Sequence, residues 1–179
     1  RSDRILWLAE ELGLRYEIVR FARDPATQRA EPALQKIHPL GKAPAIRDGD
    51  QLVFESGAII DYLVGRYGRG RLAPPQDSPD WPRYLQWLHY AEGSAMSQLI
   101  LDLFLSGQFG GAPPSPLAPA LRSASAEMLA WLDSELATRP YFAGNEFSAA
   151  DIMMVFPLRL AAGFGLLEGR RELAAYLSR

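Results

Sequence analysis

The residues of this chain best suited to chemistry lie between positions 38 and 63, in the stretch HPLGKAPAIRDGDQLVFESGAIIDYL. Lys42 supplies a cation for a carboxylate. Glu55 and Ser56 stand where a helical pattern begins, and a helix N-terminus offers N–H groups and a positive dipole end to a second carboxylate. Ala43, in an extended backbone, could pair with a bound peptide as one more strand. Together these features predict a site for a small, extended peptide with two negative charges.

Two prolines and a turn determine the elements around these residues. Pro39 and Pro44 bracket the lysine and keep its backbone extended rather than helical. Two short apolar runs then flank the sequence Asp-Gly-Asp at 48–50, which favours a hairpin because glycine accepts a positive φ freely. Beyond the hairpin, Ser56 is the candidate N-cap of a helix. That helix is indicated by apolar residues at intervals of three to four: Ile59, Ile60, Leu63 and Tyr67.

These motifs resemble the glutathione-binding half of glutathione S-transferases. The family pattern is roughly N-P-x-G-K-V-P-x-L followed by E-S-x-A-I-x-x-Y-L, and this chain has PLGKAPAI followed by ESGAIIDYL. His38 and Ala43 replace the Asn and Val that the pattern favours. The resemblance implies glutathione as co-substrate and a cis peptide bond between Ala43 and Pro44.

The resemblance also implies roles for individual residues. The backbone of Ala43 would bind the cysteinyl part of glutathione, and Lys42 would bind its glycine carboxylate. Glu55 and Ser56 would bind the γ-glutamyl end. Arg29, in a polar loop, would approach the glycine carboxylate by analogy with basic residues in some relatives. The alternative for Arg29 is a solvated loop arginine.

The beginning of the chain carries the catalytic candidate. Its sequence RSDRILWLAEELGLRYE resembles the bacterial and fungal branch of the family, in which the first helix follows S-R-S-x-R-x-L-W-L-L-E-E-L. Ser2 matches the second serine of that pattern. The serine that activates the thiol in serine-type relatives would lie just before Arg1, so Ser2 is the candidate within this chain. The alternative is that Ser2 caps the first helix.

The patterns predict an α/β domain followed by an all-α domain. By resemblance, residues 1–72 would form a thioredoxin-like, glutathione-binding domain whose first strand is absent from this chain. Its other early elements would be two helices and one strand, at 2–12, 31–37 and 14–21. A linker rich in Gly and Pro follows at 66–80. Residues 79–179 would form a helical C-terminal domain.

The second half of the chain reads as helices only. The expected segments are 81–105, 121–136 and 168–179, with irregular structure at 106–119. A further helix begins with FSAADI, in which Ser148 is the N-cap and Asp151 occupies the third helical position. This pattern is a capping box with Asp in place of the usual Glu. We therefore interpret Ser148 and Asp151 as a folding device rather than as catalytic residues.

Composition excludes several classes of function. The chain has 179 residues, of which 48% are hydrophobic and 22% are charged, and its formal net charge is −2. This charge gives no overall basic surface for nucleic acid, and no apolar run has membrane-spanning length. The absence of cysteine excludes disulfides, thiolate metal sites and a cysteine nucleophile in this chain. Two histidines without a cluster of acids argue against a metal site.

We therefore expect a glutathione transferase that joins the glutathione thiolate to small hydrophobic electrophiles. The expected protein is a cytoplasmic homodimer with a role in detoxification and no nucleic-acid or membrane partner. Two different functions on the same fold stay open. One is a non-catalytic dimeric binding or regulatory protein. The second is a glutathione-dependent isomerase, dehalogenase or peroxidase, which would differ in the pocket for the second substrate.

Overall fold

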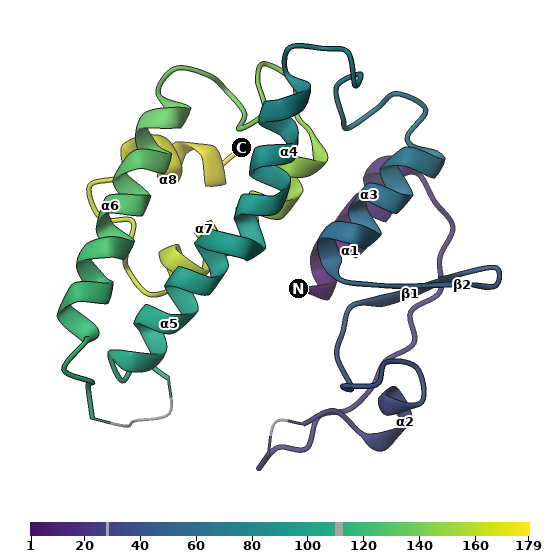
Figure 1. The fold of residues 1–179 in the computed structure, drawn as a ribbon, viewed down its shortest axis with the longest axis horizontal. Helices are drawn as coiled ribbons and strands as arrows, with labels where there is room; N and C mark the ends of the chain where they lie inside the picture. Colours follow the sequence, from purple (N-terminus) through teal and green to yellow (C-terminus); the bar gives the residue numbers. More distant parts are fainter. Residues whose placement is uncertain (28, 110–112) are drawn as a thin grey trace. The chain divides into compact units, whose positions relative to one another are not determined.

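A computed structural model describes residues 1–27, 29–109 and 113–179 of the chain. The chain divides into two compact units, Arg1–Arg71 and Leu72–Arg179 (Figure 1). The first unit combines helices with a hairpin. In the second unit, the regular elements that the structure describes are all helices.

The first unit is built on two helices that lie side by side, α1 (Ser2–Leu12) and α3 (Ser56–Tyr67) (Figure 1). A short helix, α2 (Pro32–Gln35), precedes the hairpin of β1 (Ala45–Asp48) and β2 (Gln51–Phe54). The buried side chains of α1 and α3 form its core: Ile5, Leu8, Leu12, Ile59, Ile60 and Leu63. Burial of these apolar faces stabilises the pair of helices.

The hairpin has the predicted turn. Its strands are antiparallel, with Ala45 opposite Phe54 and Asp48 opposite Gln51. Gly49 has φ 57°, the left-handed conformation that glycine adopts without steric cost. The turn chemistry of the sequence therefore determines where the strands reverse.

The strand expected at 14–21 is wrong. No described strand pairs with this segment, and the nearest ladder contact is an isolated bridge between Arg23 and Ala30. Tyr16, Ile18 and Val19 keep 44%, 44% and 66% of their surface exposed. A strand exists through hydrogen bonds to a neighbour, so residues with high β propensity do not form one alone.

The expected N-caps of the first unit are also wrong. Helix α1 begins at Ser2 with Arg1 as its N-cap, and α3 begins at Ser56 with Glu55 as its N-cap. Each serine therefore lies one position inside its helix, where it cannot cap it. The end of α1 is as expected, since Gly13 adopts φ 67°. Arg71 reinforces this end by donating hydrogen bonds to the carbonyl oxygens of the last two helical residues.

The second unit begins with one long helical rod that changes its winding near the middle. Helix α4 (Trp81–Tyr90) continues as the π-helical segment η1 (Ala91–Met96) and then as α5 (Ser97–Leu105). The predicted helix at 81–105 is thus present, but its pattern did not indicate the π-helical turn. Such segments are rare and occur frequently at functional sites.

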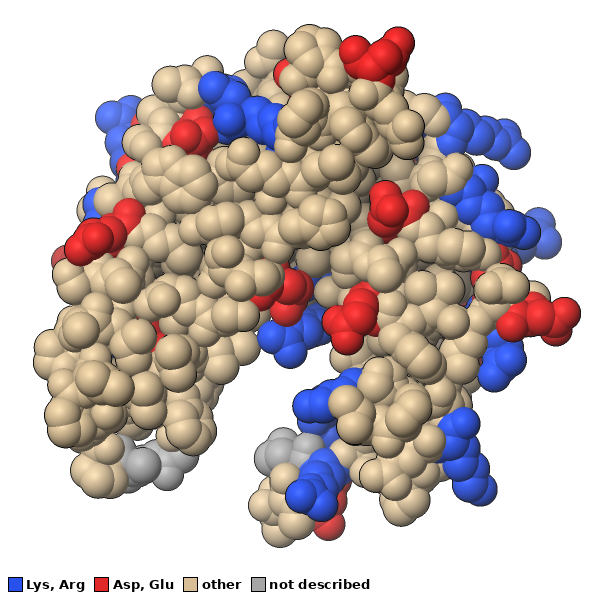
Figure 2. Space-filling model, viewed as in Figure 1, with Lys and Arg blue, Asp and Glu red and all other residues tan. Residues whose placement is uncertain are grey.

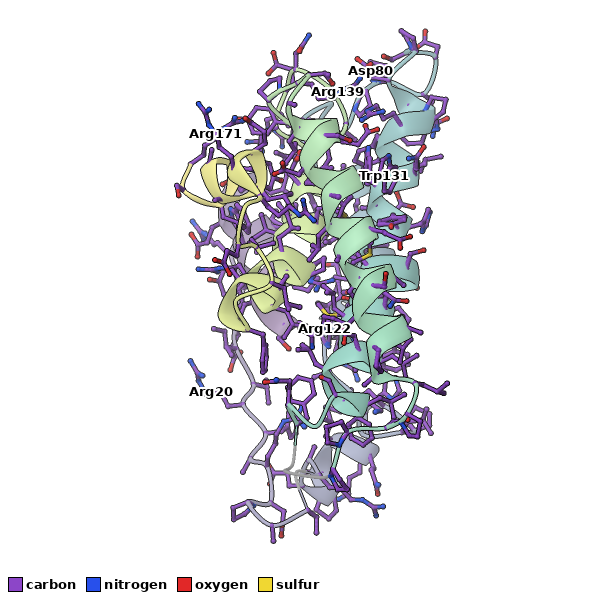
Figure 3. All side chains as sticks on the ribbon, turned by 90° about the vertical axis from the view of Figure 1, so that its left-hand side faces the viewer. Arg20, Asp80, Arg122, Trp131, Arg139 and Arg171 are labelled. Carbon is purple, nitrogen blue, oxygen red and sulfur yellow. The ribbon has the colours of Figure 1, made fainter. Side chains whose placement is uncertain are left out.

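Three further helices complete this unit: α6 (Ala118–Leu136), α7 (Ala149–Gly163) and α8 (Arg171–Leu177). Helix α7 packs against α4 and η1, while α6 packs against α5 and α8. Figure 3 shows α6 running beside the long rod, with Trp131 next to α4. The indole ring of Trp131 stacks on that of buried Trp87, with ring centroids 5.1 Å apart.

The capping box expected at the start of α7 is present. Asp151 Oδ2 accepts hydrogen bonds from the backbone N–H and the hydroxyl of Ser148, each at 2.9 Å. Its Oδ1 accepts from the N–H of Phe142 at 3.0 Å and from the phenol of Tyr176 at 2.9 Å. Asp151 is fully buried, and burial raises the pKa of its carboxyl while these four donors lower it. This residue joins the start of α7 to the end of α8 and to the turn that precedes α7.

Candidate functional site

One end of the hairpin brings together the residues that the sequence marked for binding. Because Ala45 lies opposite Phe54, the segment that leads into β1 and the first turn of α3 meet at the same end of the hairpin. Lys42 and Ala43 are exposed there, and the peptide bond between Ala43 and Pro44 is cis. The exposed backbone of this segment is free of regular secondary structure, so a peptide could pair with it.

Glu55 marks the start of α3 with an unusual backbone. Its φ of 66° and ψ of 124° lie outside the ordinary regions for a residue with a side chain. Such conformations persist where the surroundings enforce them, and they cluster at ligand-binding sites. The Glu55 side chain is exposed and makes no capping hydrogen bond, so the first N–H groups of α3 are not capped by it.

Ser56, the first helical residue, is buried with 5% of its surface exposed. Its Oγ accepts a hydrogen bond from Nη1 of Arg4 at 3.4 Å. The sequence patterns did not single out Arg4, although a signal was present: Arg4 stands four residues before Leu8 on the apolar stripe of α1. Both Arg4 and Leu8 are fully buried.

His38 supports the turn that presents Lys42. Its Nδ1 accepts the N–H of Leu40 at 3.0 Å, so the ring hydrogen is on Nε2. The imidazole contacts the ring of Phe54, with centroids 4.4 Å apart. Gly41 donates its N–H to the His38 carbonyl at 2.8 Å and adopts φ 58°. His38, which replaces the Asn of the family pattern, therefore stabilises the turn next to the candidate site.

A second cluster ties the far end of the hairpin to α3. Asp48 Oδ2 accepts hydrogen bonds from the phenols of Tyr62 and Tyr67, at 2.8 and 2.5 Å. The Arg66 Nε lies 3.3 Å from the same oxygen. The two phenol hydrogen bonds, and then the charge of Arg66, lower the pKa of Asp48. These contacts hold β1 in a defined position relative to α3.

The remaining candidates are Ser2 and Arg29. Ser2 is exposed in the first turn of α1, two residues before Arg4. Arg29 is exposed, and its backbone bonds with Asp24 and Thr27 hold its loop. Ser2 therefore lies in the same helical turn as Arg4, whose guanidinium contacts Ser56, whereas Arg29 lies in the loop held by Asp24 and Thr27.

Neither a metal site nor a membrane-spanning helix is found among the residues that the structure describes. Across residues 1–27, 29–109 and 113–179, no three His, Cys, Asp or Glu side chains are grouped so that they could hold a metal ion. None of the described helices combines the length and the apolar character needed to cross a bilayer.

Comparison with known proteins identifies the family. Residues 1–65 match the family model of the glutathione S-transferase N-terminal domain, and residues 115–179 match that of the C-terminal domain. Glutathione S-transferase 3 of Schizosaccharomyces pombe is 35% identical over 172 residues, which cover 88% of this chain and 69% of that protein.

Solved structures agree with this assignment. A glutathione S-transferase from Actinobacillus pleuropneumoniae superposes with a TM-score of 0.86 and 29% identity, covering 99% of this chain and 80% of that one. A sphingomonad glutathione S-transferase complexed with glutathione gives a TM-score of 0.77 and 30% identity, covering 99% and 87%. The chain belongs to the glutathione S-transferase family. Its fold class, a thioredoxin-like N-terminal domain followed by a helical domain, is the expected one.

Proposed function

We propose that this protein catalyses the conjugation of glutathione to small hydrophobic electrophiles. The observation that carries the proposal is the meeting of Lys42, the Ala43 backbone and the Ser56 end of α3 at one end of the hairpin. Family membership supplies the ligand, because relatives carry this name and a relative's structure contains glutathione. The protein would therefore use glutathione as its co-substrate.

Glutathione would lie along the extended backbone that leads into β1. Its γ-glutamyl carboxylate would accept hydrogen bonds from Ser56 and the free N–H groups of α3. Its cysteinyl backbone would pair with Ala43, and its glycine carboxylate would meet the ammonium of Lys42. Lys42 is exposed, so this contact would contribute only about 0–1 kcal/mol.

The chemistry requires a thiolate. A free thiol has a pKa near 8.5 and is mostly protonated at neutral pH, so a nearby hydroxyl donor and a helix N-terminus would lower that pKa. Ser2, in the first turn of α1, is the candidate donor within this chain. The sulfur lone pair forms a bond to the electrophilic carbon, the leaving group departs with its electron pair, and the thiol proton passes to solvent.

The helical unit carries a surface that suits a second copy of the chain. A groove of about 390 Å³ runs between the η1–α5 segment and α6. It is lined by Tyr90, Gly93, Ser94, Ser97, Gln98, Leu101, Ala124 and Met128. Leu101 and Trp131 keep 47% and 39% of their surface exposed, and Figure 2 shows few charged side chains over the lower ends of α5 and α6. We propose an isologous homodimer through this face, a cytoplasmic location and a role in detoxification.

The proposal is tested by binding and turnover together. Glutathione is titrated calorimetrically into the protein, and conjugation is then followed with a chlorinated dinitrobenzene as the electrophile. Binding with thioether formation supports the transferase. Binding without turnover would replace it with the non-catalytic binding protein. Turnover of only isomerisable, halogenated or peroxide substrates would favour a glutathione-dependent isomerase, dehalogenase or peroxidase.

A further inference from the structure

A fully buried arginine lies directly behind the first residue of α3. Arg4 has no exposed surface, and its Nη1 contacts Oγ of Ser56, which is 52 positions further along the chain. Its neighbours on the same face of α1, Ile5 and Leu8, are buried apolar residues. Charged residues are almost never fully buried unless they are paired, so this guanidinium is held by specific contacts. One of those contacts is the hydroxyl of Ser56.

The chemistry of the two groups determines the direction of their hydrogen bond. A guanidinium carries donors only, so the Ser56 oxygen must be the acceptor. The hydroxyl hydrogen of Ser56 is then left to donate to another group. Among the described residues this hydroxyl has no second partner, although the side chain is 5% exposed. A buried donor without an acceptor is destabilising, and a bound acceptor would remove that cost.

Further donors converge on the same point. The N–H groups in the first turn of α3, a helix of 12 residues, have no partner within the helix. The N-cap residue, Glu55, does not cap them through its side chain. The permanent charge of Arg4 adds to the positive end of the helix dipole. The Ser56 hydroxyl, the first backbone N–H groups of α3 and the positive charge of Arg4 therefore all favour the same kind of ligand group, a carboxylate.

We propose that Arg4 is a positioning residue that holds the Ser56 hydroxyl as a donor and makes this site select peptides with a free α-carboxylate on their first residue. The inference rests on the proposed function and deepens it, because the γ-glutamyl end of glutathione carries such a carboxylate. Arg4 acts through Ser56, since its own nitrogen donates to the serine oxygen. A ligand that lacks the negative charge at this position would lose the charge-assisted hydrogen bond from Ser56 and would bind more weakly.

The test compares two ligands on several variants. Calorimetry measures the dissociation constants of glutathione and of glutathione amidated at its glutamyl α-carboxylate. The unmodified protein is expected to prefer glutathione by about tenfold to hundredfold, the range for a charge-assisted hydrogen bond. Arg4→Met removes every donor from a chain of similar length, and we expect it to reduce this preference to about threefold or less.

Controls separate selectivity from stability. Leu8→Ala changes an equally buried residue on the same helix, and it should lower the melting temperature without changing the preference. Ser56→Ala should reduce the preference as Arg4→Met does. The double variant Arg4→Met with Ser56→Ala should reduce it no further, because both changes remove the same interaction.

The outcomes distinguish the two proposals. If the unmodified protein does not bind glutathione, the proposed function fails. If it binds glutathione with the expected preference and Arg4→Met keeps that preference, the role of Arg4 is overturned. If Arg4→Met does not fold, Arg4→Lys decides, because lysine keeps the charge but cannot reproduce the planar donor group. A preference reduced by at least threefold in Arg4→Lys supports the role, and an unchanged preference overturns it.

Discussion

Tyr176, in the last helix, donates its phenol hydrogen to Oδ1 of Asp151, 25 positions earlier in the chain, at 2.9 Å. Asp151 is fully buried and Tyr176 is 6% exposed. Burial, followed by the neighbouring charge of Asp151, raises the pKa of Tyr176 well above its usual value, so the phenol remains a donor throughout the neutral range. The bond connects α8 to the capping box of α7.

Removal of this phenol should destabilise the helical unit. We expect Tyr176→Phe to lower the free energy of unfolding by about 1.5–3 kcal/mol, the range for a hydrogen bond to a charged group. Chemical denaturation followed by circular dichroism measures the change. Tyr16→Phe is the matched control, because the phenol of Tyr16 also donates to a carboxylate, that of Glu10, but the ring is 44% exposed. An equal loss in both variants would contradict the prediction.

Two substitutions in the candidate site should weaken glutathione binding in a fixed order. Ser56→Ala removes a charge-assisted hydrogen bond and should reduce affinity about tenfold to hundredfold. Lys42→Ala should reduce it by no more than about fivefold, because the ammonium is exposed. Calorimetric titration of glutathione into both variants measures the order, and Arg47→Ala, an exposed cation of the hairpin, serves as the control. The reverse order would argue against the proposed orientation of the peptide.

The pH dependence of stability should report the cluster at the hairpin tip. The pKa of Asp48 is lowered in the folded protein, chiefly by hydrogen bonds from Tyr67 and Tyr62. A carboxyl with a lowered folded pKa stabilises the fold above its unfolded pKa, about 3.9, and this contribution is lost as the pH falls through the folded pKa.

Asp48→Asn tests this relation. The difference in stability between the unmodified protein and the variant should be constant above about pH 5 and should shrink as the pH falls below about 4. Urea denaturation at a series of pH values measures it. Asp50→Asn, in the same turn, is the control and should show a smaller difference at every pH. A difference for Asp48→Asn that grows toward low pH would refute the assignment.

The start of α8 is capped by a residue from another helix. Asp133, in α6, accepts the N–H groups of Glu172 and Leu173 on one oxygen, at 3.0 and 2.9 Å. Asp133→Ala should cost about 0.5–2 kcal/mol, as the loss of a helix cap does, while Asp133→Asn should retain most of the stability. Thermal unfolding compares the two variants. Equal losses would mean that charge, rather than hydrogen bonding, is the main contribution.

The proposed dimer is tested at the groove between the η1–α5 segment and α6. Leu101→Glu places a charge in the groove and should shift the protein toward the monomer in sedimentation at micromolar concentration. Leu117→Glu is the matched control, because Leu117 is 63% exposed and does not line the groove. A dimer that survives Leu101→Glu, or unmodified protein that sediments as a monomer, would exclude this interface.

The chemistry of neighbouring residues was sufficient to predict much of the secondary structure. Turn residues determined the hairpin around Gly49, helical periodicity located α3 and the long rod from Trp81, and the order Ser148 to Asp151 located the start of α7. These features depend on neighbours within a few positions, so a single sequence carries them. The same holds for the binding motif at 38–63, whose residues by themselves indicate the family.

The features that the sequence did not predict depend on contacts between residues far apart in the chain. The segment at 14–21 has strand-forming residues, but a strand requires a partner that lies elsewhere in a sheet. Ser56 became the first helical residue rather than the cap because Glu55 adopts a positive φ that the surrounding structure must hold. Arg4 came to lie behind Ser56, and Tyr176 beside Asp151, through helix packing across 52 and 25 positions. Pattern and spacing within one segment do not encode such pairs, because they arise only when buried faces pack together.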